Sequence, residues 1–72
     1  MIKQIKIGEY EHYKGGRYRV LSLAKHSETL EDMVVYEALY DVGQIWVRPL
    51  AMFAEQVEVN GIMVPRFRYL NS

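Results

Sequence analysis

The stretch KHSETLEDMVVYEALYDVGQIWVRPLAMFAEQV, residues 25–57, decides the fold of this 72-residue chain. Its middle part is rich in valine and tyrosine, which fit a pleated surface better than a helix, so we predict a strand from Met33 to Tyr40. A turn then leads to a second strand from Ile45 to Arg48. Because proline suits the first position of a helix, where its missing N–H costs nothing, Pro49 predicts one helical turn over Leu50–Phe53.

The polar segment HSETLED, before the first of these strands, leaves a second interpretation open. Ser27 and Thr29 are residue types that cap helices, so an amphipathic helix over Glu28–Leu39 is the alternative to the strand. Such a helix would replace the all-strand interpretation with an OB-like or an α+β fold.

Two strands are predicted on the N-terminal side of this stretch. The first follows Gly8 and ends at Lys14-Gly15-Gly16, where paired glycines can supply positive φ at the centre of a tight hairpin. The second, Arg17 to Lys25, alternates with a period of two. Because it is apolar on both faces beyond Val20, it is typical of a strand buried from both sides, as in a small closed barrel.

A further hairpin is predicted on the C-terminal side. Asn60-Gly61 is the strongest hairpin signal in the chain, and it joins strands at Gln56–Val59 and Ile62–Val64, while Pro65 confines the second strand to an edge or an exit. Five or six short strands with tight turns predict a mainly β fold. Our first choice is a small SH3-like antiparallel barrel with one short helical turn near residues 50–53, and the second choice is an OB-fold.

Length and composition restrict the class of protein. A chain of 72 residues forms one domain at most, here residues 1–72. The absence of cysteine excludes disulfides and thiolate metal sites, and it fits a reducing compartment. No apolar run approaches the roughly 20 residues of a membrane span, and the start of the chain alternates lysine with isoleucine, unlike a signal peptide. We therefore expect a cytoplasmic domain without a membrane partner.

The charges are unevenly distributed although the net charge is zero. Residues 1–26 contain six basic and two acidic side chains, whereas residues 27–60 contain seven acidic side chains and one basic. We expect basic and acidic strands to lie side by side and to neutralise each other. Phosphate binding draws on summed positive charge, so the neutral total argues against nucleic acid as a partner.

Several motifs in matching order resemble those of the bacterial family known as domain of unknown function 1653. The resemblance covers roughly Gly8 to Phe67. The matching motifs are Tyr13-Lys14-Gly15, Tyr18-Arg19-Val20, His26-Ser27-Glu28-Thr29, Val35-Tyr36, Leu39-Tyr40, Trp46-Val47-Arg48-Pro49, Met52-Phe53 and Pro65-Arg66-Phe67. The resemblance implies an SH3-like fold, in a family without a settled activity.

The pair Trp46 and Arg48 is the sharpest functional signal in the sequence. Two residues apart on one strand, the two side chains share a face, while Val47 points to the other. If Val47 is in the core, Trp46 and Arg48 face outward or line a groove, where an arginine can stack on rings or bind a carboxylate. The reverse assignment buries Trp46 and makes Arg48 the partner of a buried acid, and the sequence leaves both assignments open.

His26 and Glu28 belong to the tetrad His26-Ser27-Glu28-Thr29, which combines a base, a hydroxyl and a carboxylate. Adjacent residues on one loop rarely supply the geometry of a catalytic triad, so we expect a structured turn with no catalytic residue. A metal pair of His12 with His26 is weakly supported because the two histidines lack a fixed helical spacing. We expect no metal and no cofactor, and we expect His12 to pack across strands.

Six buried positions and five site residues follow from these patterns. The expected core residues are Val20, Val35, Val47, Met52, Phe53 and Val57. The expected site is an aromatic groove, and its residues are His26, Glu28, Trp46, Arg48 and Arg66. Two arginines at one mouth favour an anionic ligand.

The sequence therefore predicts a non-enzymatic binding or interaction module for a peptide, a partner protein or a small anionic ligand. One alternative is a small enzyme, or a subunit of one, with His26 and Glu28 as its acid–base pair. Another is weak nucleic-acid binding through Lys14, Arg17 and Arg19, with Tyr18 between the two arginines.

Overall fold

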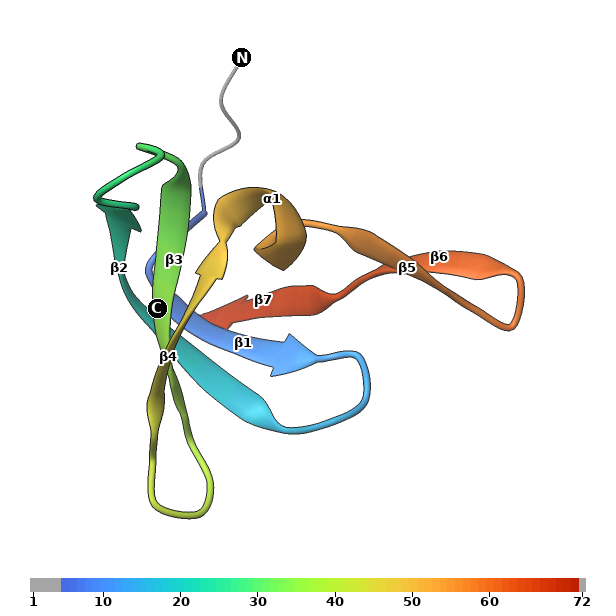
Figure 1. Ribbon diagram of the computed structural model, residues 1–72. Coiled ribbons are helices and arrows are strands. Elements are labelled where there is room, and N and C mark those ends of the chain that lie inside the picture. The colour runs from blue at the N-terminus through green and yellow to red at the C-terminus, as the bar shows by residue number, and fades with distance from the viewer. Residues whose placement is uncertain (1–4, 72) are drawn as a thin grey trace.

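A computed structural model describes residues 5–71 of the chain (Figure 1). The first four residues, which include Ile2 and Lys3 of the alternating start, lie outside the described residues. The elements, in chain order, are β1 (Gly8–His12), β2 (Arg17–Lys25), β3 (Asp32–Ala38), β4 (Ile45–Pro49), α1 (Leu50–Phe53), β5 (Gln56–Val59), β6 (Ile62–Pro65) and β7 (Phe67–Asn71). The fold is mainly β, with one short helical element within residues 5–71.

Five strands form one antiparallel sheet in the order β4-β3-β2-β1-β7, and β5 pairs with β6 in a separate hairpin. Figure 1 shows that the sheet is strongly curved, that α1 lies over its open side, and that the β5–β6 hairpin extends away from it. The closed barrel expected from the sequence is not confirmed, because β4 and β7 remain the two edges of the sheet in the described part of the chain.

The predicted strand at residues 33–40 is confirmed as β3, and the alternative helix over Glu28–Leu39 is wrong. The valines and tyrosines of this segment take part in pairing with both β2 and β4. The helical turn at Leu50–Phe53 and the hairpin of β5 and β6 are also confirmed. Asn60 and Gly61 both have positive φ, 51° and 79°, as the tightest hairpin turns require.

The strand β2 is buried less than the sequence predicted. Its neighbour β1 pairs only with Arg17 to Val20, and the pairing of β2 with β3 shifts register between Val20 and Ser22. Beyond Val20, β2 is therefore covered on one side by β3 alone, and residues 21–25 are exposed. The apolar residues on both faces of β2 predicted burial of both faces. However, β2 extends beyond the end of β1, so its last residues are exposed.

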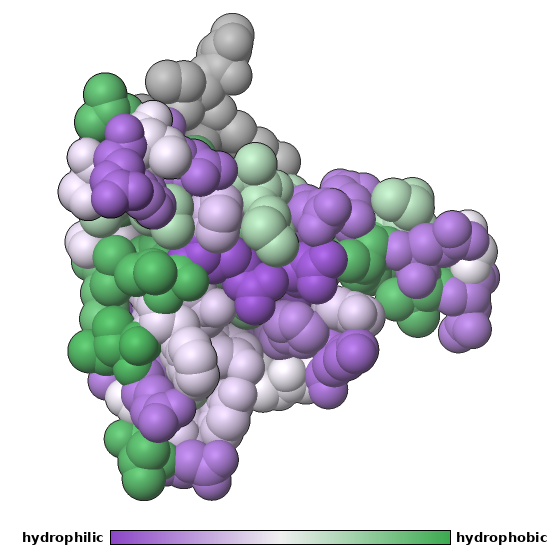
Figure 2. Space-filling model, viewed as in Figure 1, coloured by the Kyte–Doolittle hydropathy of each residue, from purple (hydrophilic) through white to green (hydrophobic). Residues whose placement is uncertain are grey.

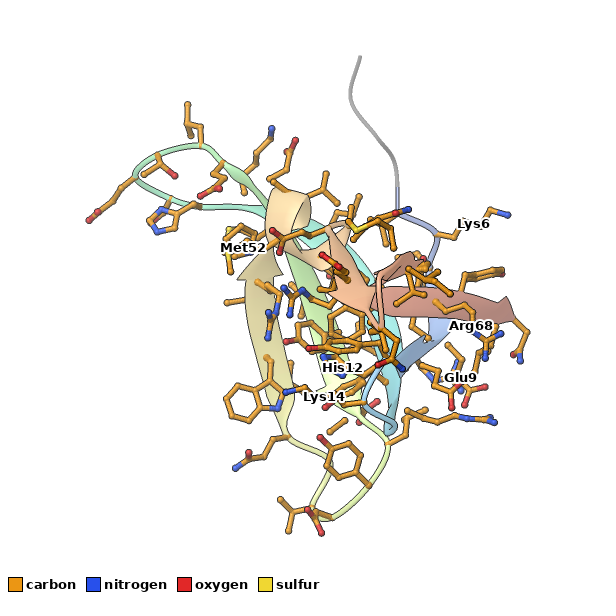
Figure 3. All side chains as sticks on the ribbon, turned by 90° about the vertical axis from the view of Figure 1, so that its right-hand side faces the viewer. Lys6, Glu9, His12, Lys14, Met52 and Arg68 are labelled. Carbon is orange, nitrogen blue, oxygen red and sulfur yellow. The ribbon has the colours of Figure 1, made fainter. Side chains whose placement is uncertain are left out.

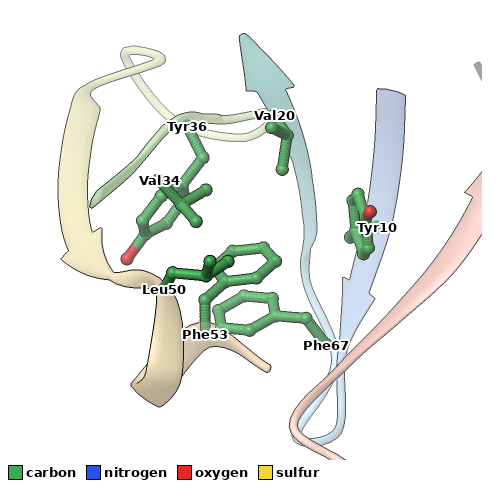
Figure 4. Packing of buried hydrophobic residues seen from close by; sticks show 7 residues of the cluster. All are labelled: Tyr10, Val20, Val34, Tyr36, Leu50, Phe53 and Phe67. Carbon is green, nitrogen blue, oxygen red and sulfur yellow. The ribbon is translucent and has the colours of Figure 1, made fainter. Parts of the chain in front are cut away.

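The core lies between the inner face of the sheet and α1 (Figure 4). Its buried residues are Tyr10, Val20, Val34, Tyr36, Ala38, Leu50, Phe53 and Phe67. The rings of Phe53 and Phe67 stack in parallel, with centroids 4.1 Å apart and planes inclined by 2°. This stack joins α1 to the last strand, so aromatic packing holds together the part of the fold where hydrogen bonds leave the sheet open.

Two of the six expected core residues are wrong, and two are confirmed. Val20 and Phe53 are buried, whereas Val47 is 61% exposed and Met52 is 47% exposed. On β3 the even-numbered residues face inward, so Val35 and its partner Val47 lie on the outer face. In α1, Leu50 and Phe53 are three apart and share the buried side, and Figure 3 shows Met52 beside α1, away from the rings near His12.

The other two expected core residues, Val35 and Val57, are half-buried. Val35 lies on the outer face of β3, and Val57 belongs to the hairpin that projects from the body. Neither position reaches the ring cluster that forms the centre of the core. Both side chains are therefore only partly covered, because the well-packed core lies elsewhere, between the inner face of the sheet and α1.

The outer face of the sheet carries alternating charges, as the sequence predicted. Glu9 lies opposite Arg19, and Glu11 lies opposite Arg17 on one side and Arg68 on the other. The carboxylate of Glu11 and the guanidinium of Arg68 are 2.6 Å apart. Opposite charges at facing positions attract across strands, so the basic β2 is neutralised by its neighbours.

No helix in the described range is long and apolar enough to cross a membrane.

Candidate functional site

A groove of about 210 Å³ opens on the inner face of the sheet, beside β4. It is lined by Tyr18, Tyr36, Tyr40, Trp46 and Arg48. Figure 2 shows pale surface of intermediate hydropathy at the lower centre of this view, between an apolar edge over β3 and β4 and the strongly hydrophilic middle. Rings with one polar atom each give surface of this kind.

Strand register brings the groove residues onto one face. Tyr36 pairs with Trp46, and two residues along β3, Val34 pairs with Arg48. Val34 and Tyr36 are buried on the inner face, so their partners on β4 point to the same side. The question that the sequence left open is thereby answered. Trp46 lines the groove with 50% of its surface exposed and is not in the core.

Arg48 is half-buried and rests on aromatic rings. Its Nε donates a hydrogen bond to the hydroxyl oxygen of Tyr36 at 3.2 Å, and its guanidinium carbon lies 5.8 Å from the ring centroid of Phe67. Among residues 5–71, no carboxylate forms an ion pair with Arg48. The charge is therefore oriented by neutral groups, and its two terminal nitrogens remain for another acceptor.

The hydroxyls of Tyr18 and Tyr40, two residues that line the groove, are hydrogen-bonded to each other. Burial raises the pKa of Tyr18 to about 12, with a further contribution from the hydrogen bond to Tyr40. The phenol of Tyr18 therefore keeps its proton at neutral pH. Because the pair shares one bond, one O–H points into the pair and the other is available to a neighbour.

His12 lies next to the groove and packs across strands, as expected. Its ring contacts that of Phe67 on the paired strand β7, at 4.9 Å between centroids, and its Nδ1 accepts a hydrogen bond from the Lys14 N–H at 3.1 Å. Burial lowers the pKa of His12, and the charges of Arg66, Arg48 and Lys14 lower it further. The imidazole is therefore neutral at pH 7, and it adds no charge beside Arg48.

His26 and Glu28 do not line the groove. Nδ1 of His26 accepts hydrogen bonds from the N–H groups of Glu28 and Thr29, at 3.1 and 3.3 Å, and Thr29 Oγ1 accepts one from the N–H of Glu31. This is the structured turn that the sequence predicted. It joins β2 to β3 at the end opposite the β3–β4 turn that carries Tyr40 (Figure 1).

Arg66 lies near the groove without lining it. Its charge lowers the pKa of His12, as the charge of Arg48 does. However, the guanidinium of Arg66 is 2.9 Å from the carboxylate of Glu55, and the backbones of these two residues are also bonded. Of the five predicted site residues, the structure therefore brings together Trp46 and Arg48 in the groove.

Three tyrosines of the groove were missed by the sequence analysis as site residues. These are Tyr18, Tyr36 and Tyr40, which the sequence analysis named in the matching motifs but did not place in the groove. The period-two pattern places Tyr36 and Ala38 on one face of β3, but only the register with β4 shows that Trp46 shares it. The register between strands could not be predicted from a single sequence, so the shared face of Tyr36 and Trp46 could not be predicted either.

A second hollow of about 410 Å³ lies between the β1–β2 turn and the β5–β6 hairpin. It is lined by Glu11, His12, Tyr13, Gly15, Val59, Val64, Pro65 and Arg68. Although this hollow is larger, its two opposite charges, Glu11 and Arg68, already form an ion pair. It therefore offers apolar surface but no unsatisfied charge to a ligand.

A metal site finds no support in the described residues, where no group of three His, Cys, Asp or Glu side chains comes together. The two histidines lie at opposite ends of β2, since His12 precedes the β1–β2 turn and His26 follows Lys25. The groove itself contains phenols, an indole and a guanidinium, which are not the ligands that zinc prefers.

Comparison with known proteins identifies the family of the chain. The family described as "Protein of unknown function (DUF1653)" matches residues 8–69. The crystal structure of a DUF1653 protein from Bordetella bronchiseptica is 38% identical in sequence and superimposes with a TM-score of 0.84, covering 92% of this chain and 87% of that one. None of the curated proteins is significantly similar in sequence. The chain belongs to the DUF1653 family.

Proposed function

We propose that this domain is a non-enzymatic binding module, a partly open SH3-like barrel whose groove takes an anionic group. The anion would be carried by a peptide, a partner protein or a small molecule. The observation that supports this proposal is the state of Arg48. The side chain is half-buried and fixed by Tyr36, yet no carboxylate of the described residues compensates its charge.

Arg48 differs in this respect from the two arginines that follow Pro65. Arg66 and Arg68 are each within 3 Å of a carboxylate, at 2.9 and 2.6 Å. A charge that is partly removed from water costs free energy unless it is paired. An arginine that is held in place but not paired is therefore suited to receive a carboxylate or phosphate from outside, through its two terminal nitrogens.

The groove also supplies neutral donors for the same acceptor. The hydroxyl of Tyr36 accepts the bond from Arg48, so its own O–H is available to a ligand. One O–H of the Tyr18–Tyr40 pair is available as well. Two phenol O–H groups and a guanidinium thus surround the space, while the indole of Trp46 offers a flat apolar wall.

An acid–base enzyme built on His26 and Glu28 has less support. The imidazole of His26 is used as an acceptor for two backbone N–H groups of its own turn. Neither residue lines the groove at β4 or the hollow beside the β5–β6 hairpin. General acid–base chemistry needs groups that face a shared substrate space, and this turn provides none.

The fluorescence of Trp46 provides a direct test, because Trp46 is the only tryptophan in the chain. We expect 3-phenylpropionate to change the emission in a saturable way. The amine 3-phenylpropylamine, which has the same ring but the opposite charge, should have no such effect. The substitution Arg48→Gln should abolish the response to the carboxylate, since it removes the charge that attracts it.

Arg68→Gln is the matched control, because Arg68 is already paired with Glu11 and does not line the groove. This variant should respond to the carboxylate as the parent does. An equal response to the acid and the amine, or an unchanged response in Arg48→Gln, would show that the groove does not select an anion.

A further inference from the structure

The strand β4 is an edge of the sheet, and the register shows which of its backbone groups are unpaired. The N–H of Ala38 donates to the carbonyl of Gln44 at 2.9 Å, whereas the N–H of Leu39 donates to the carbonyl of Arg17 on β2. In an antiparallel ladder the bonding side alternates from residue to residue. The backbone groups of Trp46 and Arg48 therefore face β3, and those of Ile45 and Val47 face outward, where the sheet ends.

The side chains leave this edge accessible. Ile45 and Val47 are each 61% exposed, and Trp46 is 50% exposed. Natural proteins commonly protect such edges with charges, but the single charged residue of β4 is Arg48, whose side chain lies over the groove. The N–H and C=O groups of Ile45 and Val47 thus form a short template for one more strand.

We propose that an acidic peptide in extended conformation adds to β4 as a sixth strand of the sheet. The inference rests on the proposed function, since the peptide carries the anion that the groove takes. The added strand runs antiparallel to β4, the slightly more stable arrangement. An acidic side chain then lies opposite Arg48, and a large apolar side chain two residues later lies opposite Trp46.

The ladder geometry supports this placement. An added strand exchanges hydrogen bonds with Ile45 and Val47, so the positions opposite Trp46 and Arg48 are non-hydrogen-bonded pairs. In such pairs the side chains approach most closely, and they lie on the groove face. The residue between them points to the outer face, beside the exposed Ile45 and Val47. The recognised tripeptide, written from its N-terminal end, is therefore an acidic residue, an apolar residue and a large apolar residue.

The unpaired charge favours this peptide over a second copy of the chain. Two copies that pair antiparallel through β4 match residues with outward backbone groups, so Ile45 faces Val47 or each of them faces its own copy. These registers set Gln44, Val42 or Trp46 of one copy opposite Arg48 of the other, so the guanidinium still meets no carboxylate. An acidic peptide satisfies both the backbone edge and the charge.

The test uses a blocked heptapeptide of threonines and valines with the central triad glutamate-valine-phenylalanine, titrated against the fluorescence of Trp46. Replacing its glutamate by glutamine should weaken binding by about tenfold or more, as the loss of a charge-assisted bond implies. Methylation of the backbone nitrogen of the central valine, which would donate to Val47, should also weaken binding by about tenfold. Methylation of the glutamate nitrogen, which points away from β4, is the matched control and should be tolerated.

The outcomes separate the two proposals. If 3-phenylpropionate binds but both methylated peptides bind like the parent peptide, strand addition is wrong and the anion groove stands. If neither the carboxylate nor the peptide binds, both proposals are wrong. A dimer in light scattering that Val47→Lys dissociates in the absence of peptide would show that β4 pairs with a second copy, which overturns the inference.

Discussion

At the scale of single residues, Arg48 is held by one hydrogen bond from Nε to Tyr36 and by the ring of Phe67. Each of these contacts contributes about 1 kcal/mol. We therefore expect Arg48→Ala to lower the free energy of unfolding by about 1–2 kcal/mol. Urea denaturation measures this loss. A loss of about 3–5 kcal/mol would indicate instead that Arg48 balances a buried carboxylate, because removing one partner of a buried pair leaves an uncompensated charge.

His12 provides a second residue-scale prediction, because its pKa is lowered from the ordinary value of 6.5 by burial and by Arg66, Arg48 and Lys14. A folded-state pKa below the unfolded value means that the associated stability is complete above about pH 6.5 and is lost as the pH falls through the folded pKa. Arg48→Ala removes one of the three positive charges, so it should raise the pKa of His12. An NMR titration of the ring protons measures this change.

Arg19→Ala is the control for this titration, since Arg19 lies on the outer face opposite Glu9 and is not among the groups that shift His12. It should leave the pKa of His12 unchanged. If Arg48→Ala also leaves it unchanged, the guanidinium is farther from the imidazole than the structure places it.

The sequence predicted that Trp46 and Arg48 share a face, because a strand alternates with a period of two. It did not reveal which face is inner. Val47 looked like a core residue, yet it lies on the outer face opposite Val35. Both faces of β4 carry large apolar side chains, so hydropathy could not decide between them. The decision comes from Val34 and Tyr36 on the neighbouring strand, which pack against α1.

At the scale of elements, α1 is a single helical turn, and one of its sides faces the core. Leu50 and Phe53 are buried, and Met52 is exposed. Phe53→Ala should lower the free energy of unfolding by about 3–5 kcal/mol, because it leaves a cavity beside Phe67. A domain of this size has roughly 5 kcal/mol in total, so the variant should be largely unfolded.

Met52→Ala is the matched variant, one position away in the same turn. It should lower stability by less than about 1 kcal/mol, since an exposed side chain loses little contact. Thermal unfolding followed by circular dichroism compares the two variants. Equal losses would mean that α1 is not oriented with Phe53 inward.

The elements themselves were more predictable than their burial. Asn60-Gly61 fixes a hairpin through the positive φ that both residues adopt, and Pro49 marks the start of α1. The strand β7 was not predicted, although it begins with Phe67, which fills the centre of the core. Its segment FRYLN is short and mixes charged with aromatic residues, so only its pairing with β1, more than fifty residues away, defines it.

At the scale of the whole molecule, closure of the sheet depends on contacts that are distant in sequence. Apolar strands and tight turns are common to closed barrels and to open curved sheets. The sequence could therefore predict a mainly β domain, but not whether a ladder of hydrogen bonds between the two edge strands closes the sheet. In the described residues, the stack of Phe53 on Phe67 takes the place of that ladder. An unpaired β4 is the consequence, and it gives the groove its accessible edge.

The arrangement of charge over the whole sheet also predicts which partners are excluded. On the outer face, Glu9, Glu11 and Glu37 each lie opposite an arginine of β2, so the basic strand presents no continuous positive surface. Nucleic acids bind mainly through the summed attraction of phosphates to unpaired basic side chains. We therefore expect no binding to labelled duplex DNA or single-stranded RNA in fluorescence anisotropy, even at a low salt concentration of about 50 mM.

A triple variant, with lysine in place of these three glutamates, is the control that makes a negative result informative. It turns the outer face uniformly basic while leaving the groove side chains unchanged, so it should acquire binding that weakens steeply as salt is added. If the unmodified domain already binds with such a salt dependence, the arginines of β2 are available to phosphates despite their acidic neighbours. The neutral total charge would then be a poor guide to the partner, and the outer face would be a second binding surface, separate from the groove.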